Sequence, residues 1–404
     1  MTTYNAESRT WSRKSDPKSD IIPSESYIGK AVLKRLQASD PERIVEVNHD
    51  TDECFSVSDV LKNTVTIAMN LNDLNLKVGD IVALYCRHNS YISSLAYGCY
   101  LNGTPWCPFD TMSDDLDYLL DYIMPTVLIY DEEFKPKVKE TLQRLKLSCI
   151  THELVFGNPS STNSVENVLL KKQDISGFIP KDLSPYGSSD QVIACISFTS
   201  GSTGKPKAVP IKNTMFVYEI NGLADVPLLK HPNTNIISFS SIRWISQLAL
   251  MLATVFFDIR RTSTGRYPDH VLICETIHKR KPTAVFVSTS MYFHVLEHFE
   301  RSKEYDFSSL EYIIFGGEPF CTSLQSRFHD LIPDVRIFQG YGMTECGGTI
   351  ALQSDLGSLN GGHLKKGFSI RIVDENGEKV SYDIRNSSNQ RNSCISWILK
   401  KRNM

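Results

Sequence analysis

The chain has 404 residues and a formal net charge of −3 at pH 7, so it can form two or three lobes and gives no electrostatic reason to expect nucleic acid or an acidic membrane surface as a partner. Its ten cysteines are scattered without a Cys-x-x-Cys pair, and the first twenty residues lack the apolar segment of a secretory signal, which favours an intracellular protein with reduced thiols. The longest apolar stretch, residues 245–257, is too short to cross a bilayer and predicts a buried helix, so no transmembrane segment is expected.

The first part of the chain alternates predicted strands with predicted helices. Residues 1–23 are polar and are expected to form a disordered arm, and residues 24–190 form a first lobe. Alternation of this kind predicts a doubly wound, mainly parallel sheet. The predicted strands are 80–86, 104–109, 126–130 and 149–156, and the predicted helices are 91–101, 114–123 and 135–146, with Gly103 as a C-cap.

A stretch rich in Ser, Asn, Gly and Pro, residues 158–189, predicts a linker before a second lobe at residues 191–350. The alternation repeats there, so the fold class is α/β with two doubly wound lobes. Residues 351–380 are expected to be a fragment of a third, β-barrel lobe that opens with a hairpin around Asn376-Gly377, and residues 381–404 a divergent tail. The second lobe's predicted strands are 192–198, 236–240, 283–288, 312–315 and 335–338, and its helices are 215–223, 245–257, 271–279 and 291–300.

The loop after the predicted strand at 192–198 combines two glycines, small hydroxyl side chains and two lysines. Glycine lets backbone N–H groups approach an anion, hydroxyls donate to phosphate oxygens, and lysine adds a compact positive charge. A strand leading into such a loop predicts a phosphate-binding site, and a flexible surface loop is the alternative. The spacing differs from a Walker A motif, which needs four residues between its glycines. The candidate residues are Thr199, Ser200, Gly201, Ser202, Thr203, Gly204, Lys205 and Lys207.

A second glycine-bearing segment, Gly316-Gly317-Glu318, follows the predicted strand at 312–315. Two glycines at the carboxyl end of a strand allow a flat ligand to lie against the backbone, and ligands of open α/β sheets bind at such ends. An ordinary Gly-Gly turn is the alternative interpretation.

A third segment, residues 339–345, follows the predicted strand at 335–338 and reads Gln-Gly-Tyr-Gly-Met-Thr-Glu. Tyr341 between two glycines can stack on a base, and Thr344 offers a hydroxyl to phosphate. Glu345 offers the hard oxygen that Mg²⁺ prefers. An exposed turn with a solvated glutamate is the alternative.

Taken together, these segments resemble the adenylate-forming (AMP-binding) enzymes: acyl-CoA synthetases, 4-coumarate-CoA ligases, insect luciferases and peptide-synthetase adenylation domains. The resemblance rests on Phe-Thr-Ser-Gly-Ser-Thr-Gly-Lys-Pro-Lys at 198–207 and Gly-Tyr-Gly-Met-Thr-Glu at 340–345, and extends over about residues 24–380. It implies an acid–thiol ligase that uses ATP and Mg²⁺ to convert a small carboxylic acid to an acyl-adenylate, normally followed by transfer to CoA.

The resemblance also implies roles for individual residues. The loop at 199–207 would hold the phosphates of ATP, with Thr203 and Lys207 among the catalytic residues. The remaining implied roles place Gly316, Gly317 and Glu318 beside the adenine and the acyl group, Gln339, Gly340 and Tyr341 at the nucleotide, Gly342 beside the acyl chain, Thr344 on the phosphates, and Glu345 on the magnesium ion.

Two stretches depart from the family pattern. Arg243 and Trp244 stand where many relatives carry a histidine or aromatic gate to the acyl pocket, so they are candidates for that pocket, with a core tryptophan as the alternative. The resemblance stops after Ser381, before the family's small C-terminal domain and its catalytic lysine. We therefore expect a C-terminally truncated or alternatively ended chain with impaired activity. The family analogy favours a cytoplasmic or peroxisomal location, although the chain ends without a Ser-Lys-Leu signal.

Two rival interpretations are open at this point. His294-Val-Leu-Glu297-His298 matches the inverted zinc-protease pattern, and a helix would place both histidines on one face, as a zinc hydrolase requires. The other rival is a catalytically silent nucleotide- or acyl-binding protein on the same fold. Stoichiometric zinc in the purified protein would distinguish the first from the second.

Overall fold

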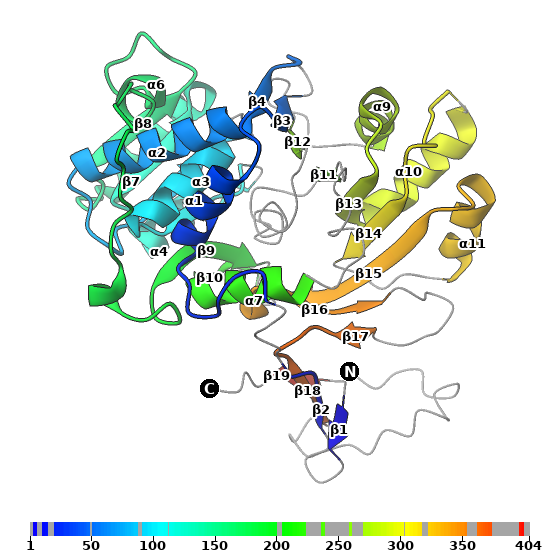
Figure 1. Cartoon of the computed structure of the whole chain (residues 1–404). Coiled ribbons are helices and arrows are strands. Elements are labelled where there is room, and N and C mark those ends of the chain that lie inside the picture. The colour runs from blue at the N-terminus through cyan, green and yellow to red at the C-terminus, as the bar shows by residue number, and fades with distance from the viewer. Residues whose placement is uncertain are drawn as a thin grey trace.

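The structure is a computed structural model. It describes residues 3–5, 10–14, 20–48, 51–87, 91–111, 113–199, 204–223, 236–238, 258–260, 270–302, 304–316, 322–353, 362–373 and 396–399. Figure 1 shows two lobes, a first from the N-terminal half in blue to green and a second in yellow to orange. Helix α7 (Asn213–Leu223) runs between them, and a small sheet lies below it in the view.

The first lobe is built on a six-stranded sheet with the order β10-β9-β6-β5-β7-β8. Its neighbouring strands are parallel except for the antiparallel hairpin of β9 and β10. Leu84 and Ile129 lie in one apolar cluster and Tyr85 and Tyr130 in another, because successive side chains of a strand point to opposite faces. Both faces are therefore buried, as predicted for a doubly wound sheet. The strands are β5 (Val82–Tyr85), β6 (Trp106–Pro108), β7 (Val127–Asp131), β8 (His152–Phe156), β9 (Ile193–Thr199) and β10 (Lys207–Lys212).

The helices of this lobe carry clear end signals. Helix α3 ends at Gly103, whose φ of 72° makes the predicted left-handed C-cap. Helix α2, which the sequence analysis did not predict, begins with a capping box: Ser56 Oγ accepts from Asp59 N at 3.1 Å, and Asp59 Oδ2 accepts from Ser56 N at 2.9 Å. The helices are α1 (Ile28–Ala38), α2 (Val57–Asp73), α3 (Ile92–Asn102), α4 (Leu116–Ile123), α5 (Lys135–Leu145) and α6 (Val165–Val168), with 3₁₀ turns at Glu132–Phe134 and Ser184–Tyr186.

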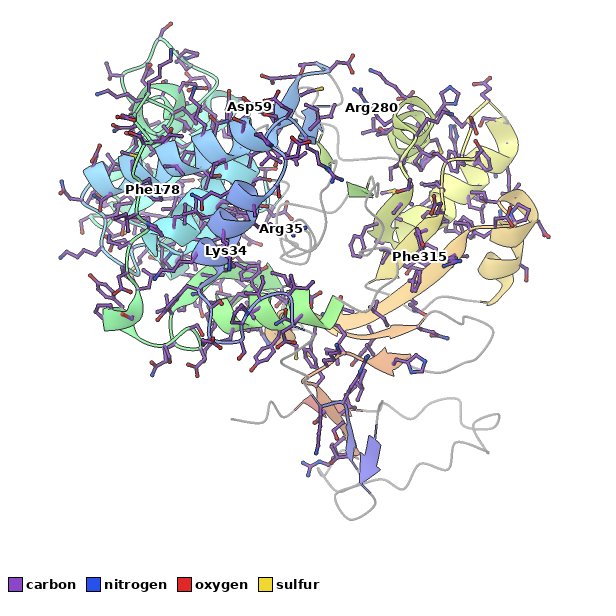
Figure 2. All side chains as sticks on the ribbon, viewed as in Figure 1. Lys34, Arg35, Asp59, Phe178, Arg280 and Phe315 are labelled. Atoms are coloured by element: carbon purple, nitrogen blue, oxygen red, sulfur yellow. The ribbon has the colours of Figure 1, made fainter. Side chains whose placement is uncertain are left out.

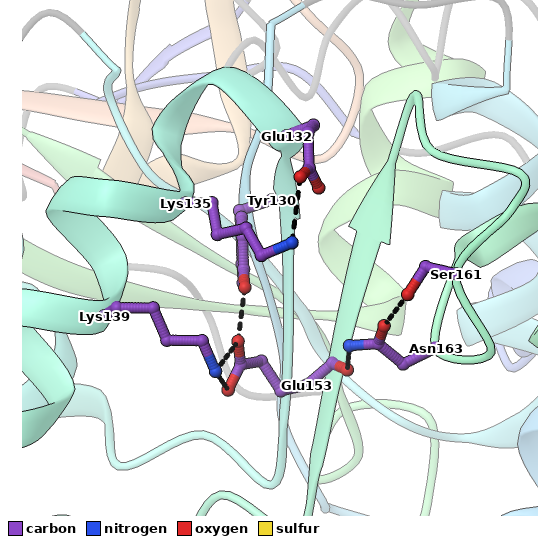
Figure 3. Close-up of polar contacts among 7 residues, drawn as sticks. All are labelled: Tyr130, Glu132, Lys135, Lys139, Glu153, Ser161 and Asn163. Atoms are coloured by element: carbon purple, nitrogen blue, oxygen red, sulfur yellow. Dashed lines mark hydrogen bonds and ion pairs between the residues drawn. The ribbon is translucent and has the colours of Figure 1, made fainter.

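A polar network fixes the edge of the sheet where β8 pairs with β7 (Figure 3). Glu153 accepts a hydrogen bond from the Tyr130 hydroxyl and lies 2.8 Å from Lys139 Nζ on α5. Asn163 Nδ2 donates to the Glu153 carbonyl oxygen at 2.9 Å. Burial and the neighbouring Glu153 raise the pKa of Tyr130, so its phenol stays a neutral donor.

The second lobe contains another six-stranded sheet, with the order β11-β13-β14-β15-β16-β17. The first four strands run parallel to one another. Strand β16 is antiparallel to β15, and β17 is antiparallel to β16. Phe315 is fully buried under the helices, with its ring centroid 4.7 Å from that of Tyr292 (Figure 2). Ile314, on the opposite face, joins the cluster that contains Phe216 of α7. The elements are β11 (Ile236–Ser238), β13 (Ala284–Ser288), β14 (Tyr312–Gly316), β15 (Arg336–Met343), β16 (Gly348–Gln353), β17 (His363–Leu364), α9 (His270–Arg280), α10 (Thr289–Ser302) and α11 (Thr322–Leu331).

The lobe boundaries expected at 190/191 and 350/351 do not separate the two sheets. Strand β9 belongs to the first sheet, because Cys195 pairs with Trp106 of β6. Strand β16 pairs with β15 and carries the second sheet beyond residue 350. A hydrophobic run identifies a strand but not its neighbour, which is why composition misplaced both boundaries. The helix predicted at 245–257 lies outside the described residues.

Two asparagines attach α7 to the N-terminal part of the chain. Asn213 Oδ1 accepts from Ile28 N at 2.9 Å, and its Nδ2 donates to Val192 O at 2.9 Å. Asn221 makes the same pair of contacts with one residue, accepting from Ile22 N at 3.0 Å and donating to Ile22 O at 2.7 Å. Buried amides therefore hold the start of α7 to the start of α1, and the last turns of α7 to Ile22 in the segment before α1.

We expect Asn213→Ala to lower the free energy of unfolding by about 1–3 kcal/mol, because two side-chain hydrogen bonds are lost and the buried Ile28 N–H loses its acceptor, whereas Val192 O keeps the backbone N–H of residue 213. Asn167→Ala is the matched control: its amide also bonds two backbone carbonyls but is exposed, so a loss of under about 1 kcal/mol is expected. Urea unfolding measures both. Equal losses in the two variants would show that the buried contacts of Asn213 are not important.

The two lobes also meet through a three-stranded sheet formed by β12 (Asp258–Arg260), β3 (Ile44–Asn48) and β4 (Cys54–Ser56). Beside it, Asp52 pairs with Arg280 and, at 3.0 Å, with Lys279 of α9; Figure 2 shows Arg280 on the side of α9 that faces the first lobe. Hydrogen bonds from Lys279 and Arg280 lower the pKa of Asp52. Because Asp52 and Lys279 are exposed and Arg280 is only half-buried, the pairs add little stability.

The small sheet contains strands from both ends of the chain, in the order β1-β2-β18-β19. Its strands are β1 (Thr3–Asn5), β2 (Thr10–Ser12), β18 (Ser369–Val373) and β19 (Ser396–Leu399), and all pairs are antiparallel.

This sheet corrects two expectations. Residues 3–5 and 10–12 form strands instead of a disordered arm, because β2 pairs with β18 more than 350 residues away. The described partners of β18 are β2 on one side and β19 of the tail on the other, not the segment directly after Asn376-Gly377, and the turn itself lies outside the described residues. The four described strands form an open sheet, as a fragment of a β lobe would. Within the parts of the chain that the structure describes, no helix is both long and apolar enough to span a membrane.

Candidate functional site

The predicted phosphate loop connects the two strands of the β9–β10 hairpin. Thr199 at the end of β9 pairs with Lys207 at the start of β10, so the loop leaves and rejoins the sheet at the same end of these two strands. Gly204 has a φ of 91°, and a Cβ built on it would meet no heavy atom of the described residues within 4 Å. Lys205 and Lys207 are exposed, and their ammonium groups are available to an anion. Ser200, Gly201, Ser202 and Thr203 lie outside the described residues.

Tyr118 of α4 contacts the second half of this loop. Its hydroxyl donates to the Pro206 carbonyl oxygen at 3.0 Å, and Lys205 Nζ lies 4.8 Å from the centroid of its ring. The ring also stacks on Tyr122, with a centroid separation of 5.6 Å. Sequence reasoning missed this residue, because nothing in the pattern of α4 indicates which of its exposed aromatic residues faces the loop.

The second and third glycine-bearing segments lie side by side at one end of the second sheet. Gly316 at the end of β14 pairs with Gly340 of β15. Among the described residues, a Cβ on Gly316 would meet no heavy atom closer than the Gly340 carbonyl oxygen at 3.8 Å. Gly317 and Glu318 lie outside the described residues.

The third segment, which the sequence predicts to follow a strand that ends at residue 338, is itself a strand over most of its length. Gln339, Gly340, Tyr341 and Gly342 continue β15 and pair with β16, with a register shift between Tyr341 and Gly342. Tyr341 pairs with Ala351 of β16, ten residues downstream, and this pairing overrides the tendency of the two glycines to form a turn. Burial, with a smaller contribution from Cys346, raises the pKa of Tyr341, so this half-buried phenol is neutral at physiological pH.

Thr344 and Glu345 begin a short 3₁₀ helix, η5 (Thr344–Cys346), at the end of β15. This helix lies against β10, the strand that begins with Lys207. Glu345 is exposed, so its carboxylate is available to a cation. The structure therefore brings the described parts of all three segments to one region: β14 beside β15, and η5 beside β10.

The donor set at this region suits a magnesium–nucleotide complex. Nucleotide sites usually hold Mg²⁺ through one or two carboxylates together with substrate phosphates, so an exposed Glu345 on a turn that lies against β10 fits that chemistry. Arg243 and Trp244, the candidates for an acyl pocket, lie outside the described residues.

The two histidines of the inverted zinc-protease pattern lie on α10 as predicted. His298 Nε2 is 3.4 Å from Tyr305 Oη, and Glu297 is 3.7 Å from Arg301. His270 packs against both rings, with centroids 6.0 Å from His294 and 5.2 Å from His298. Among the described residues, no group of three or more His, Cys, Asp or Glu side chains is arranged to hold a metal ion.

Curated relatives with sequence similarity include enzymes of acid activation. The chain is 24% identical over 369 residues to acyl-CoA synthetase 7 of Caenorhabditis elegans and 22% identical over 376 residues to 4-coumarate–CoA ligase-like 8 of Arabidopsis thaliana. These alignments cover 87% and 89% of this chain. The chain spans 66% of the length of the first relative and 64% of the second.

Solved structures resemble the fold over most of the chain. A luciferase-like enzyme from the mealworm Zophobas morio gives a TM-score of 0.76 at 22% identity, covering 92% of this chain and 85% of that one. A long-chain-fatty-acid-CoA ligase (FadD1) from Archaeoglobus fulgidus gives a TM-score of 0.78 at 16% identity, covering 94% and 75%. The family model described as AMP-binding enzyme matches residues 33–384 of the 404. With most of its length matched, the chain belongs to the AMP-binding enzyme family.

Proposed function

We propose that the chain activates a small carboxylic acid with ATP, forming an acyl-adenylate and pyrophosphate. The observation that carries the proposal is the adjacency of the three motif segments. Gly316 pairs with Gly340, and η5, which bears Glu345, lies against the strand that begins with Lys207. The family membership and the motif residues support the same reaction.

In the proposed reaction, a carboxylate oxygen of the acid attacks the α-phosphorus of ATP. A new P–O bond forms, the bond from the α-phosphorus to the bridging oxygen breaks, and pyrophosphate leaves with that electron pair. Lys207, Thr344 and the hydroxyls of the loop stabilise the charge that develops on the phosphates, and Tyr341 stacks on the adenine. A magnesium ion held by Glu345 supplies further positive charge.

The proposed second step is transfer of the acyl group to the thiol of CoA, because two relatives are named for CoA ligation. The acid itself is proposed only as a class. Arg243 is the proposed contact for a polar group on the acid and Trp244 the proposed wall of the acyl pocket.

Pyrophosphate exchange into ATP, measured with a panel of aromatic, medium-chain and long-chain acids, tests the proposal. We expect exchange that depends on one class of acid and on Mg²⁺. Exchange with none of the acids, together with no binding of Mg–ATP by calorimetry, would refute the proposed function.

A pair of lysines on β10 offers a matched test of the phosphate loop. Lys207 and Lys212 are both exposed and stand at opposite ends of the strand. We expect Lys207→Ala to lower kcat/KM for exchange by about 100-fold, which is typical for the loss of one group that stabilises transition-state charge. Lys212→Ala is expected to change it less than twofold. Similar values for the two variants would show that Lys207 does not contact the nucleotide.

The contact of Tyr118 with the loop gives a second, smaller effect. Tyr118→Phe removes the hydrogen bond to Pro206 and keeps the ring under Lys205, so we expect KM for ATP to rise about threefold, as the loss of one half-buried hydrogen bond permits. Tyr118→Ala removes both contacts, and we expect a rise of about tenfold. Tyr122→Ala, which leaves both contacts in place, is the control. A rise of KM in Tyr122→Ala as large as in Tyr118→Ala would contradict this role.

A further inference from the structure

A buried ion pair lies where α7 meets the second sheet. Lys365, just after β17, places Nζ 2.5 Å from Glu219 Oε2 of α7, and the two side chains are 2% and 1% exposed. The same ammonium group donates to the Glu219 carbonyl oxygen at 3.1 Å. Neither residue belongs to a recognised motif segment, and they are 146 residues apart in the chain.

The pair is built into the backbone that follows η5. Glu219 Oε2 accepts a hydrogen bond from Thr349 N at 3.0 Å, and Lys365 N donates to Ile350 O at 2.9 Å. A Cβ on Gly348 would lie 3.0 Å from the Glu219 carboxyl carbon, so the glycine lets the strand approach the carboxylate. The carboxylate therefore holds the chain only four residues after Glu345.

The other end of α7 is continuous with the phosphate-loop strand. Asn213, the first residue of α7, follows directly after Lys212, the last residue of β10. Met215 packs against the residue that follows η5, because a Cβ on Gly347 would lie 2.9 Å from Met215 Cβ. Helix α7 thus joins the strand that begins with Lys207 to the turn that bears Glu345.

The arrangement is not explained by stability alone. Removing two charges from water is costly, and apolar pairs of similar size often stabilise a fold as well or better. Burial lowers the pKa of Lys365, and the neighbouring Glu219 opposes that shift. Glu219 Oε1 has no hydrogen-bond partner among the described residues. The pair instead fixes the relative position of two elements, because two charge-assisted contacts set one register between α7 and β16.

We propose that Glu219 and Lys365 are positioning residues, which set the placement of Glu345 relative to Lys207 and so the affinity for Mg–ATP. The inference rests on the proposed function. It deepens that function by assigning two residues outside the motif segments to the geometry of the nucleotide site.

The test compares the wild type with Glu219→Gln, Lys365→Met and the double variant, which removes both charges. For each chain we would measure the thermal midpoint, hydrogen–deuterium exchange of the peptide over residues 344–353, and KM and kcat for Mg–ATP in pyrophosphate exchange. Leu71→Ala, a fully buried substitution on α2 in the first lobe, supplies the effect of destabilisation alone.

We expect both single variants to raise KM for Mg–ATP about tenfold with a smaller change in kcat, and to speed amide exchange at Thr349 about tenfold. The double variant is expected to recover the thermal midpoint but to keep the raised KM, because the contact between the ammonium group and the carboxylate is still absent. A KM that returns to the wild-type value together with the midpoint, or that follows the midpoint as in Leu71→Ala, would reduce the pair to a structural role.

Gly222→Ala provides a variant that leaves both charges intact. A Cβ at this position would lie 2.1 Å from Lys365 Cε, so the lysine must move. We expect KM for Mg–ATP to rise about fivefold, and an unchanged KM would count against the inference.

Failure of the inference is distinguishable from failure of the proposed function. A wild-type chain without exchange or Mg–ATP binding refutes the function and, with it, this role. A wild-type chain that exchanges pyrophosphate, with single variants of unchanged KM and unchanged amide exchange, refutes the inference alone.

Discussion

Replacing Gly342 with alanine is expected to reduce pyrophosphate exchange more than 100-fold and to destabilise the second lobe. A Cβ at this position would lie 2.2 Å from the Gly348 carbonyl oxygen and 2.8 Å from its carbonyl carbon, both rigid backbone atoms of β16. Strands β15 and β16 must separate at the register shift between Tyr341 and Gly342. Overpacking of this kind costs about 1–3 kcal/mol of stability, and it moves η5 away from β10.

Gly340→Ala is the matched control on the same strand. Its Cβ would meet the Phe315 carbonyl oxygen at 3.4 Å and Thr349 Cγ2 at 3.6 Å, distances close to ordinary contact. We expect its thermal midpoint to fall by less than about 1 °C, which corresponds to under about 1 kcal/mol for a chain of this length. Exchange kinetics and thermal unfolding measure both variants, and an undisturbed Gly342→Ala enzyme would contradict the tight approach of the two strands.

Glu345→Gln is expected to lower kcat/KM for exchange about 100-fold while leaving the fold intact. The side chain is exposed on η5, so the substitution removes a charge without creating a buried defect. An amide oxygen is a weaker ligand for Mg²⁺ than a carboxylate, and the developing charge on the phosphates loses part of its compensation. Raising the magnesium concentration is expected to recover part of the loss. The comparison requires exchange assays over a range of Mg²⁺ concentrations and a circular dichroism spectrum of each variant.

Glu297→Gln serves as the control and also separates the two enzymatic interpretations. Glu297 is the carboxylate of the inverted zinc-protease pattern and lies outside the three motif segments. The proposed function predicts unchanged exchange in this variant. Loss of a zinc-dependent hydrolysis in Glu297→Gln, with wild-type-like exchange kinetics in Glu345→Gln, would favour the rival interpretation.

The sequence predicts the first lobe well because its elements are local. The strand at 80–86 and the helix that ends at Gly103 both have strong periodicity or a cap, and the structure contains them as β5 and α3. What it could not predict depends on distant partners. No local pattern indicates that β2 pairs with β18, or that β9 joins the first sheet beside β6.

The candidate site shows the same division. The motifs identify Lys207, Tyr341 and Glu345 as candidates, and their residue types already indicate phosphate, base and metal chemistry. From the sequence alone, residues 339–343 look like a loop. Their inclusion in β15 cannot be predicted from the sequence, because it depends on pairing with β16. Glu219 and Lys365 carry no sequence signal, because a buried pair 146 residues apart becomes visible only once the chain is folded.

Photolabelling with 8-azido-ATP in the presence of Mg²⁺, followed by peptide mapping, tests the central claim that three strand-end segments surround one nucleotide. We predict that the label attaches to the peptide containing Tyr341 or to the one containing Gly316, and that excess ATP prevents the labelling. Labelling that ATP does not compete, or that maps only to peptides of the first lobe or of helix α10, would contradict the account.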